Sequence, residues 1–158
     1  MKLLILILTI IILIIYSICY YIFPTDISIY QADIEKFDIS LLSSRQPIVI
    51  VDYLQNPEDI IKCWFKYNII NFNNDINNND WKHNNHKYLF INAIKDTEII
   101  IYKAQITKIN PTPNDKIIII KLKENQSLIL PFKWKYYGNN VNIWDIDDII
   151  TFSLGPFF

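Results

Sequence analysis

Residues 116–137 read KIIIIKLKENQSLILPFKWKYY, and this stretch decides the fold class. Lys116–Lys123 and Ser127–Leu130 are short apolar runs rich in isoleucine, a residue that favours strands. Glu124-Asn125-Gln126 separates the two runs and has the composition of a turn. The stretch therefore predicts two strands that follow each other along the chain.

Beyond Pro131, the sequence FKWKYY alternates aromatic residues with lysines. Successive side chains of a strand point to opposite faces, so we expect Trp134 and Tyr136 on one face and Lys133 and Lys135 on the other. The favoured interpretation is a core-facing strand with solvated lysines opposite. The alternative is an aromatic platform for a ligand, a glycan or a base.

The same pattern of short apolar runs recurs from residue 87 onward, with Asn-, Asp- and Pro-containing turn signals between the runs. Strands at a spacing of about 8 to 14 residues are typical of sandwiches, jelly rolls and small barrels. The predicted fold class is therefore mainly β. The expected strands are Lys87–Ile94, Glu98–Ile106, Lys116–Lys123, Ser127–Leu130, Val141–Trp144 and Asp148–Leu154.

Upstream of these strands, the sequence predicts one strand, one helix and one loop. Gln46–Leu54 is a nearly continuous apolar run, typical of a buried strand. Asn56 is a favoured helix cap and Pro57 suits the first helical position, so we expect a short helix that ends near Asn68. The Asn-rich stretch Asn71–Asn85 is expected to be a solvent-exposed loop.

The N-terminal segment has the composition of a membrane-spanning helix. Leu3–Phe23 carries no charge, no Gly and no Pro, and Pro24 follows it as a stop. As a helix it would span roughly 31 Å, close to the ~30 Å hydrocarbon core of a bilayer. We expect an uncleaved transmembrane anchor rather than a secretory signal, which needs a shorter apolar core. The predicted organisation is an anchor at 1–23, a juxtamembrane linker at 24–44 and a β domain at 45–158.

The charges that flank this segment predict its orientation. Lys2 and the terminal amine precede it, whereas the residues that follow are mostly acidic. Basic residues favour the cytosolic side, so we expect a single-pass protein with a cytosolic N-terminus. The C-terminal domain would then be lumenal, extracellular or on a virion membrane.

Composition limits the class of partner. The chain has 15 basic and 16 acidic residues and a net charge of -1, so we expect no nucleic acid as a partner. Only Cys63 lies outside the apolar N-terminal segment, which excludes a disulfide within the β domain. The sequence holds no strong catalytic motif, and we expect no cofactor. The membrane and a protein are the partners that remain.

Three sets of residues are candidates for a site. His83 and His86 could contribute to a metal site with Asp75 or Asp80, although two solvated histidines are the favoured interpretation. Asn125-Gln126-Ser127 is a glycosylation acceptor sequence, which makes Asn125 a candidate in a lumenal compartment. The candidates for holding a sugar or small apolar molecule at the mouth of a barrel are Trp134, Tyr136 and Trp144.

The order of several motifs resembles the cupin-type domains related to JmjC oxygenases, over roughly residues 44 to 154. The resemblance rests on Gln46-Pro47-Ile48-Val49-Ile50, Trp64, His83, Tyr88-Leu89-Phe90-Ile91, and Glu124-Asn125-Gln126-Ser127-Leu128-Ile129-Leu130-Pro131 with Trp134. It implies a jelly roll of the double-stranded β-helix type with one short helix, behind the single N-terminal transmembrane helix. In that family an H-x-D pair and a later histidine hold iron.

The departures from the family fall on the metal ligands. Where the family has H-x-D, this chain has His83-Asn84-Asn85, and where the family has its last histidine, it has Tyr136. A facial triad needs two histidines and one carboxylate, so the resemblance implies that the fold is kept and the oxygenase activity is lost. Composition and the single anchor also resemble membrane-anchored proteins of giant DNA viruses.

The sequence leads to one main hypothesis and two alternatives. The main hypothesis is a non-catalytic, single-pass membrane protein that displays a β domain for protein interaction at a membrane or virion surface. The first alternative is a divergent metal-dependent oxygenase that uses His83, His86 and an Asp. The second is a module that binds a small ligand or a glycan through its aromatic residues.

Overall fold

The computed structural model describes residues 2–21, 26–73, 80–103, 110–112 and 115–154, with the side chains of 16–21 and 154 left out. The fold is mainly β, as predicted, with two sheets and a few short helices, consistent with a β-sandwich. The elements are α1 (Lys2–Tyr21), β1 (Tyr30–Ala32), η1 (Ile34–Lys36), η2 (Ile39–Ser44), β2 (Ile48–Ile50), α2 (Pro57–Trp64), β3 (Ile69–Asn73), β4 (Lys82–His83), β5 (Tyr88–Ala93), β6 (Thr97–Lys103), β7 (Ile118–Leu122), β8 (Ser127–Pro131), β9 (Trp134–Tyr137), β10 (Val141–Asp147) and α3 (Ile149–Leu154).

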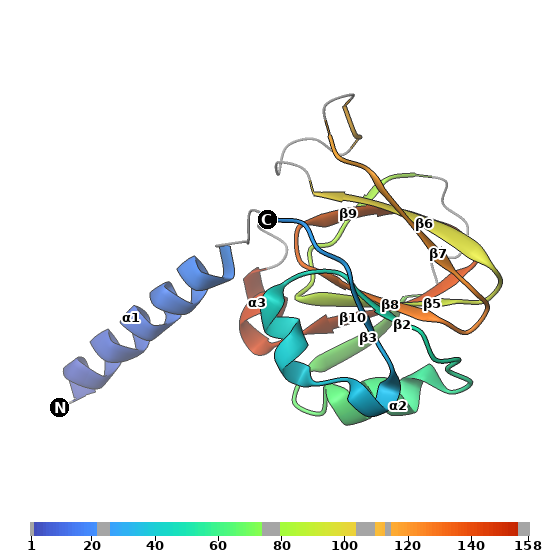
Figure 1. Cartoon of the computed structure of the whole chain (residues 1–158). Helices are drawn as coiled ribbons and strands as arrows, with labels where there is room; N and C mark the ends of the chain where they lie inside the picture. The colour runs from blue at the N-terminus through green and yellow to red at the C-terminus, as the bar shows by residue number, and fades with distance from the viewer. Residues whose placement is uncertain (1, 22–25, 74–79, 104–109, 113–114, 155–158) are drawn as a thin grey trace.

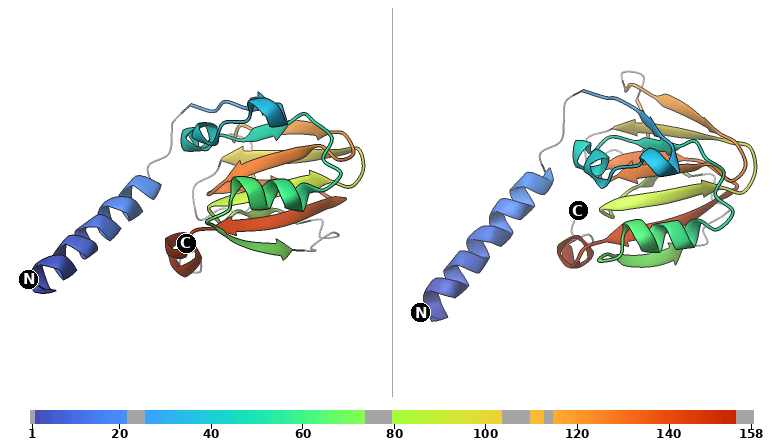
Figure 2. Two further views of the ribbon diagram at one scale, coloured as in Figure 1. Left: turned by 90° about the horizontal axis from the view of Figure 1, so that it is seen from below. Right: turned by 60° about the horizontal axis from the view of Figure 1, so that its bottom comes forward.

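Within the described residues, the strands form a six-stranded sheet in the order β1-β2-β8-β5-β10-β3 and a four-stranded sheet in the order β4-β9-β6-β7. Figures 1 and 2 show the two sheets facing each other. β1 is parallel to β2, and the other strand pairs of the described residues are antiparallel. β8 and β9 follow each other along the chain but lie in different sheets, so the turn at Phe132 and Lys133 joins the two layers. Lys133 adopts a positive φ of 67° there.

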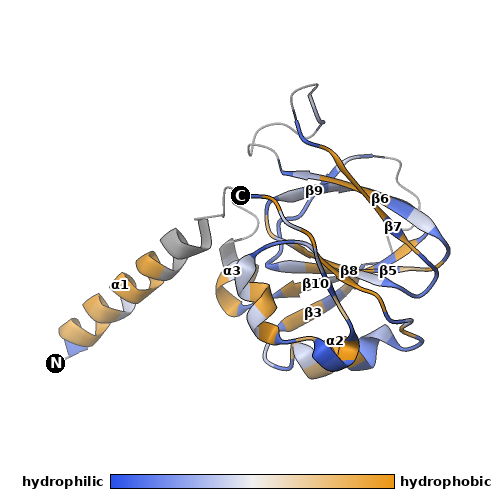
Figure 3. Cartoon of the chain, viewed as in Figure 1, coloured by the Kyte–Doolittle hydropathy of each residue, from blue (hydrophilic) through white to orange (hydrophobic). Residues whose placement is uncertain are grey.

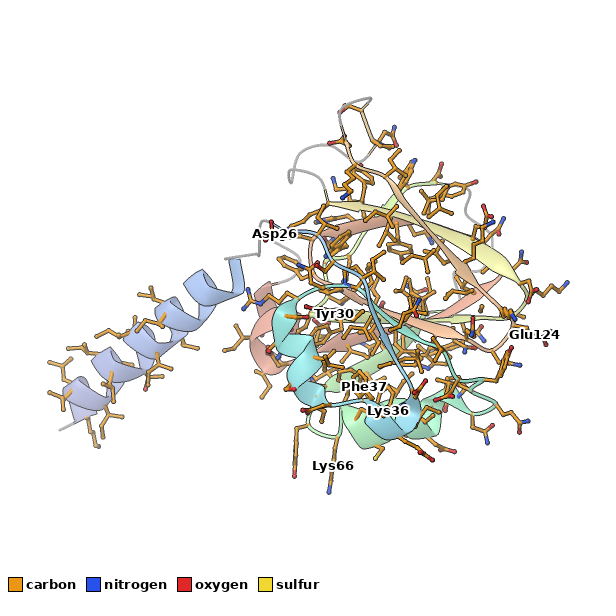
Figure 4. The ribbon with its side chains drawn as sticks, viewed as in Figure 1. Asp26, Tyr30, Lys36, Phe37, Lys66 and Glu124 are labelled. Carbon is orange, nitrogen blue, oxygen red and sulfur yellow. The ribbon has the colours of Figure 1, made fainter. Side chains whose placement is uncertain are left out.

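One apolar core fills the space between the two sheets, because both sheets direct alternate residues inward. Side chains drawn as sticks in Figure 4 occupy this space. The buried members of this cluster are Val49, Leu89, Ile91, Ala93, Ile99, Ile101, Ile120, Leu122, Leu128, Leu130, Trp134, Tyr136, Val141 and Ile143.

A second apolar core covers the other face of the six-stranded sheet, where α2, η1 and η2 pack. Phe37 stacks on Trp64 there with a ring separation of 3.9 Å. The buried members are Ala32, Leu42, Ile48, Ile50, Leu54, Ile61, Phe65, Phe90, Ile129, Trp144 and Ile146. The six-stranded sheet is therefore apolar on both faces, which explains why β2 and β8 are buried at every position.

The helix predicted after residue 56 is present as α2. Pro57 occupies its first turn and two acidic residues follow, which suits the positive end of a helix. Asn56 is at the cap position but its side chain makes no capping hydrogen bond. The helix ends at Trp64, four residues before the predicted end, because Phe65 turns into the second core with 3% of its surface exposed.

The prediction that residues 71–85 form only a loop is wrong, because β3 and β4 occupy parts of this stretch. β3 pairs along β10, with Phe72 opposite Trp144, and β4 pairs with β9, with His83 opposite Lys135. Both are edge strands of their sheets. An edge strand can carry polar side chains, so an asparagine-rich edge strand lacks the apolar pattern by which strands are predicted from sequence. Asp75 lies outside the described residues.

The prediction of a strand at residues 148–154 is also wrong, because this segment forms α3. Asp148 caps the helix, since its Oδ1 accepts hydrogen bonds from the backbone N–H groups of Ile150 and Thr151. The Thr151 hydroxyl in turn accepts from the Asp148 N–H at 2.9 Å. This reciprocal cap outweighs the strand preference of the isoleucines.

The segment predicted as a juxtamembrane linker contributes to the sheet and to the second core. Within it, β1 pairs in parallel with β2, and Ala32 and Leu42 are buried. Asp52 accepts a hydrogen bond from the Ile34 N–H at 2.6 Å, which ties η1 to the segment after β2.

The predicted anchor falls on α1, which extends away from the two sheets in Figures 1 and 2. The part of this helix that is coloured by hydropathy in Figure 3 is mainly hydrophobic. Every leucine and isoleucine between Leu3 and Ile15 is at least 43% exposed. Among the described residues, no helix is both long enough and apolar enough to cross a membrane.

The first prediction concerns the core between the sheets. Trp134 is fully buried, so Trp134→Ala is expected to cost about 3 to 5 kcal/mol of unfolding free energy in a denaturant titration of the full chain. Trp134→Phe is expected to cost less, because the indole N–H has no hydrogen-bond partner among the described groups. Ile119, 56% exposed on β7, is the control, and its Ala variant is expected within about 0.5 kcal/mol of wild type. If Trp134→Ala lowers the unfolding free energy by less than about 1 kcal/mol, Trp134 does not belong to the core between the sheets.

Candidate functional site

A histidine and two aspartates meet at the end of β10. The His86 Nδ1 is 2.6 Å from Asp147 Oδ2, and the His86 Nε2 is 3.6 Å from Asp145 Oδ2. Asp145 and Asp147 are two residues apart on one strand, so they lie on the same face as Val141 and Ile143 of the core between the sheets. The inner face of β10 thus changes from apolar to acidic toward α3, and His86 lies against the acidic end.

Asp147 organises this cluster because it is 2% exposed and accepts three hydrogen bonds. Besides His86, its donors are the Lys87 N–H at 3.0 Å and the Thr151 hydroxyl at 2.9 Å. These donors come from the segment just before β5 and from α3. The His86 N–H donates to Asn84 Oδ1 at 2.8 Å, which holds the loop before β5 in place. The geometry of the cluster is therefore fixed by buried hydrogen bonds.

The electrostatics of the cluster favour the charged form of His86. The hydrogen bond to Asp147 raises the pKa of the imidazole, and the charge of Asp145 acts in the same direction. Burial raises the pKa of Asp145, and the neighbouring Asp147 carboxylate adds to this shift, while His86 opposes it. Both ring nitrogens face carboxylates, so neither is presented to a metal or a substrate. The arrangement suits a protonated His86 side chain whose ion pairs with the two aspartates stabilise the fold.

The two histidines predicted as candidate metal ligands are not brought together. His83 is opposite Lys135, on the face of the four-stranded sheet that points away from the core, whereas His86 faces the inner side of β10. A search of the described residues finds no group of three His, Cys, Asp or Glu side chains that could hold a metal ion. Neither histidine is fully solvated as the sequence suggested, because each is partly buried.

The three aromatic candidates lie in two different cores. Trp134 and Tyr136 belong to the cluster between the sheets, as the alternation predicted, while Trp144 belongs to the cluster on the opposite face of the six-stranded sheet. They therefore do not line one cavity together. Lys135, predicted to be solvated opposite the rings, is instead fully buried.

Trp144 lies at the base of a groove that the sequence did not predict. Two cavities of about 460 and 190 Å³ adjoin between α2 and the β3–β10 edge, and both are lined by Glu58, Phe72 and Trp144. We call this surface the Phe72 groove. The Phe72 ring is 50% exposed and lies 5.1 Å from the Trp144 ring. The remaining lining residues are Gln55, Asn56, Pro57, Asp59, Ile61, Lys62, Ile70 and Asn142.

Asn125 lies in the turn between β7 and β8 with a positive φ of 65°. Its backbone is tied to neighbouring segments, since its N–H donates to the Ala93 carbonyl and its carbonyl accepts from the Leu54 N–H, each at 2.8 Å. Ser127, the third residue of the acceptor sequence, is fully buried. The predicted turn is therefore present, and glycosylation of Asn125 stays a prediction.

No protein-family model, curated protein or solved structure matches this chain. The candidate site therefore rests on geometry. In the sequence, Asp145 and Asp147 are two positions apart, and this spacing is the signal that places both side chains on one face of a strand. Nothing in the sequence indicated that Phe72 belongs to a site, because it lies among asparagines.

The second prediction concerns His86. His86→Gln is expected to lower the unfolding free energy by about 1 to 3 kcal/mol near pH 6, because the buried Asp147 carboxylate then loses its charged hydrogen-bond donor. The pKa of His86 is raised by folding, so its contribution is full below the unfolded pKa of about 6.5 and is lost as pH rises through the folded pKa.

The measurement is denaturant unfolding of wild type and variant between pH 6 and pH 9. The difference between them is expected to shrink as pH rises. His83→Gln is the matched control, because burial lowers the pKa of His83 and its charge dependence has the opposite sign. If the difference in unfolding free energy stays constant with pH, the ion pair between His86 and Asp147 does not contribute to stability.

Proposed function

We propose that this chain is a single-pass membrane protein whose α1 anchors a β-sandwich domain, which it displays for protein interaction outside the cytosol. The observation that carries the proposal is the exposure of α1. Its leucines and isoleucines from Leu3 to Ile15 are 43–73% exposed, and a helix that is apolar on all sides requires an apolar environment. Lys2 and the terminal amine favour a cytosolic N-terminus.

The finer fold in this proposal is a cupin-like jelly roll. Two facing sheets with strand pairs that are distant in the sequence support it, since β2 pairs with β8 and β5 pairs with both β8 and β10. The resemblances to JmjC-related cupin domains and to membrane-anchored proteins of giant DNA viruses belong to the same proposal. The oxygenase alternative stays a prediction without a convergent set of ligands among the described side chains.

The third prediction tests the anchor. Replacing Ile11 and Ile12 together with Arg is expected to release the protein from membranes into the alkaline-carbonate supernatant, because each Arg at a helix centre costs about 2.5 to 3.5 kcal/mol on insertion. Wild type is expected in the pellet. Tyr67→Arg, at a body position that is 92% exposed, is the control and is expected to pellet like wild type. Wild-type protein that is fully extracted by carbonate would refute the anchor.

A second candidate function is binding of a neutral saccharide in the Phe72 groove. The groove combines an exposed aromatic ring with the amide side chains of Gln55, Asn56 and Asn142 and the carboxylates of Glu58 and Asp59. Aromatic rings contact the C–H faces of sugars, while amides and carboxylates bond to their hydroxyl groups. The volume of about 460 Å³ lies in the range of small-molecule sites.

The fourth prediction tests this candidate by titration of the full chain in detergent with a panel of neutral oligosaccharides. Phe72→Ala is expected to weaken binding at least tenfold while leaving the unfolding midpoint close to that of wild type, because half of the ring surface is exposed. Tyr53→Ala, also exposed but outside the groove, is expected to bind like wild type. Equal affinity in wild type and Phe72→Ala, or binding of no saccharide, would exclude the groove as a saccharide site.

A further inference from the structure

Two side-chain nitrogens on the outer face of the four-stranded sheet, one from Lys135 and one from His83, are buried and have no hydrogen-bond partner among the described residues. Lys135 on β9 is directly opposite His83 on β4, so the two side chains share one face of the sheet. Lys135 is 0% exposed. Its Nζ and the His83 Nε2 are both buried, and neither has a hydrogen-bond partner among the groups that the structure describes.

This arrangement is costly unless something satisfies it. An ammonium group carries three donors, and a buried charge without hydrogen bonds costs far more than a neutral donor. The His83 ring has a side-chain hydrogen bond with Asn85, but its Nε2 has no hydrogen-bond partner, so one nitrogen of each residue is unsatisfied among the described groups. Native proteins rarely bury even one such group without a partner, a water or a ligand.

The surroundings define what kind of ligand would fit. Tyr102, fully buried, is opposite Lys135 on the other side, and the Trp81 ring meets the Tyr102 ring edge-on at 4.9 Å. Lys133 adds positive charge near His83. Asp115 is the carboxylate whose charge acts on Lys135, and its Oδ2 accepts hydrogen bonds from Thr112. The site is thus rich in nitrogen donors and walled by aromatic rings.

We propose that Lys135 and His83 together bind a small oxyanion, of the phosphate or sulfate class, on the outer face of the four-stranded sheet. The oxygens of such an anion accept hydrogen bonds from both nitrogens at once and neutralise the buried ammonium. The anion is either free in solution or the phosphate group of a larger molecule, and both share this chemistry.

Proton linkage gives the proposal a signature. Burial lowers the pKa of Lys135 and of His83, Lys133 lowers the pKa of His83 further, and Asp115 partly opposes the shift at Lys135. A bound anion favours the charged forms of both groups, so binding takes up protons and the affinity rises as pH falls. Sulfate keeps its charge over the neutral range, so its pH dependence reports the protein groups alone.

The test is a calorimetric titration of the full chain in detergent micelles with sulfate at constant ionic strength, at pH 6 and pH 8. Thermal unfolding with and without sulfate accompanies it. For wild type we expect binding that is at least fivefold tighter at pH 6 and a rise in the unfolding midpoint. Lys135→Met is expected to lose both effects, and His83→Gln to weaken binding at least tenfold and to flatten its pH dependence.

Lys121→Met is the matched control, because Lys121 lies on β7 of the same sheet and its ammonium group is exposed beside Glu98. It is expected to bind sulfate like wild type. If Lys135→Met does not fold, His83→Gln decides the question. No binding by wild type, or equal binding by wild type and His83→Gln, would overturn the proposal. Inorganic phosphate and glycerol phosphate form the last arm, in which tighter binding of the ester identifies a phosphorylated molecule as the ligand.

Discussion

The six-stranded sheet must be covered on both faces, and the rest of the domain follows from this constraint. β8 and β2 are buried at every position, so neither face of these two strands meets water. The four-stranded sheet covers one face and builds the larger core, while α2, η1 and η2 cover the other. Chain segments as distant as η2 and β9 therefore belong to one domain, because each supplies part of the cover.

The candidate sites lie where these covers end. The Phe72 groove opens beside the β3 edge, where α2 no longer covers the second core, and it exposes half of the Phe72 ring. The cluster around Asp147 lies where the inner face of β10 changes from apolar to acidic next to α3. The pair of Lys135 and His83 lies on the face of the four-stranded sheet that points away from the main core. The three places have different chemistry, so the experiments on them are independent.

Prediction from the sequence succeeded where local pattern and burial agree. The strands after residue 87 are continuous apolar runs bounded by turns, and the structure has strands at five of the six predicted places. The prediction failed where a helix cap or an edge position decides the structure. The Asp148 cap converts an isoleucine-rich segment into α3, and pairing with β10 makes a strand of the polar stretch at β3. Neither effect has a periodic signal.

By itself, the sequence determined that the chain combines a charge-free N-terminal segment with a mainly β domain, because both properties follow from local composition and spacing. Only the tertiary structure decided which polar side chains are buried together. Lys135 was expected in solvent and is fully buried, and His86 was expected to be free and is bound to Asp147, 61 residues away. Those contacts depend on how strands from distant parts of the chain pair across two sheets, and alternation along one strand gives the face of a residue but not what covers that face.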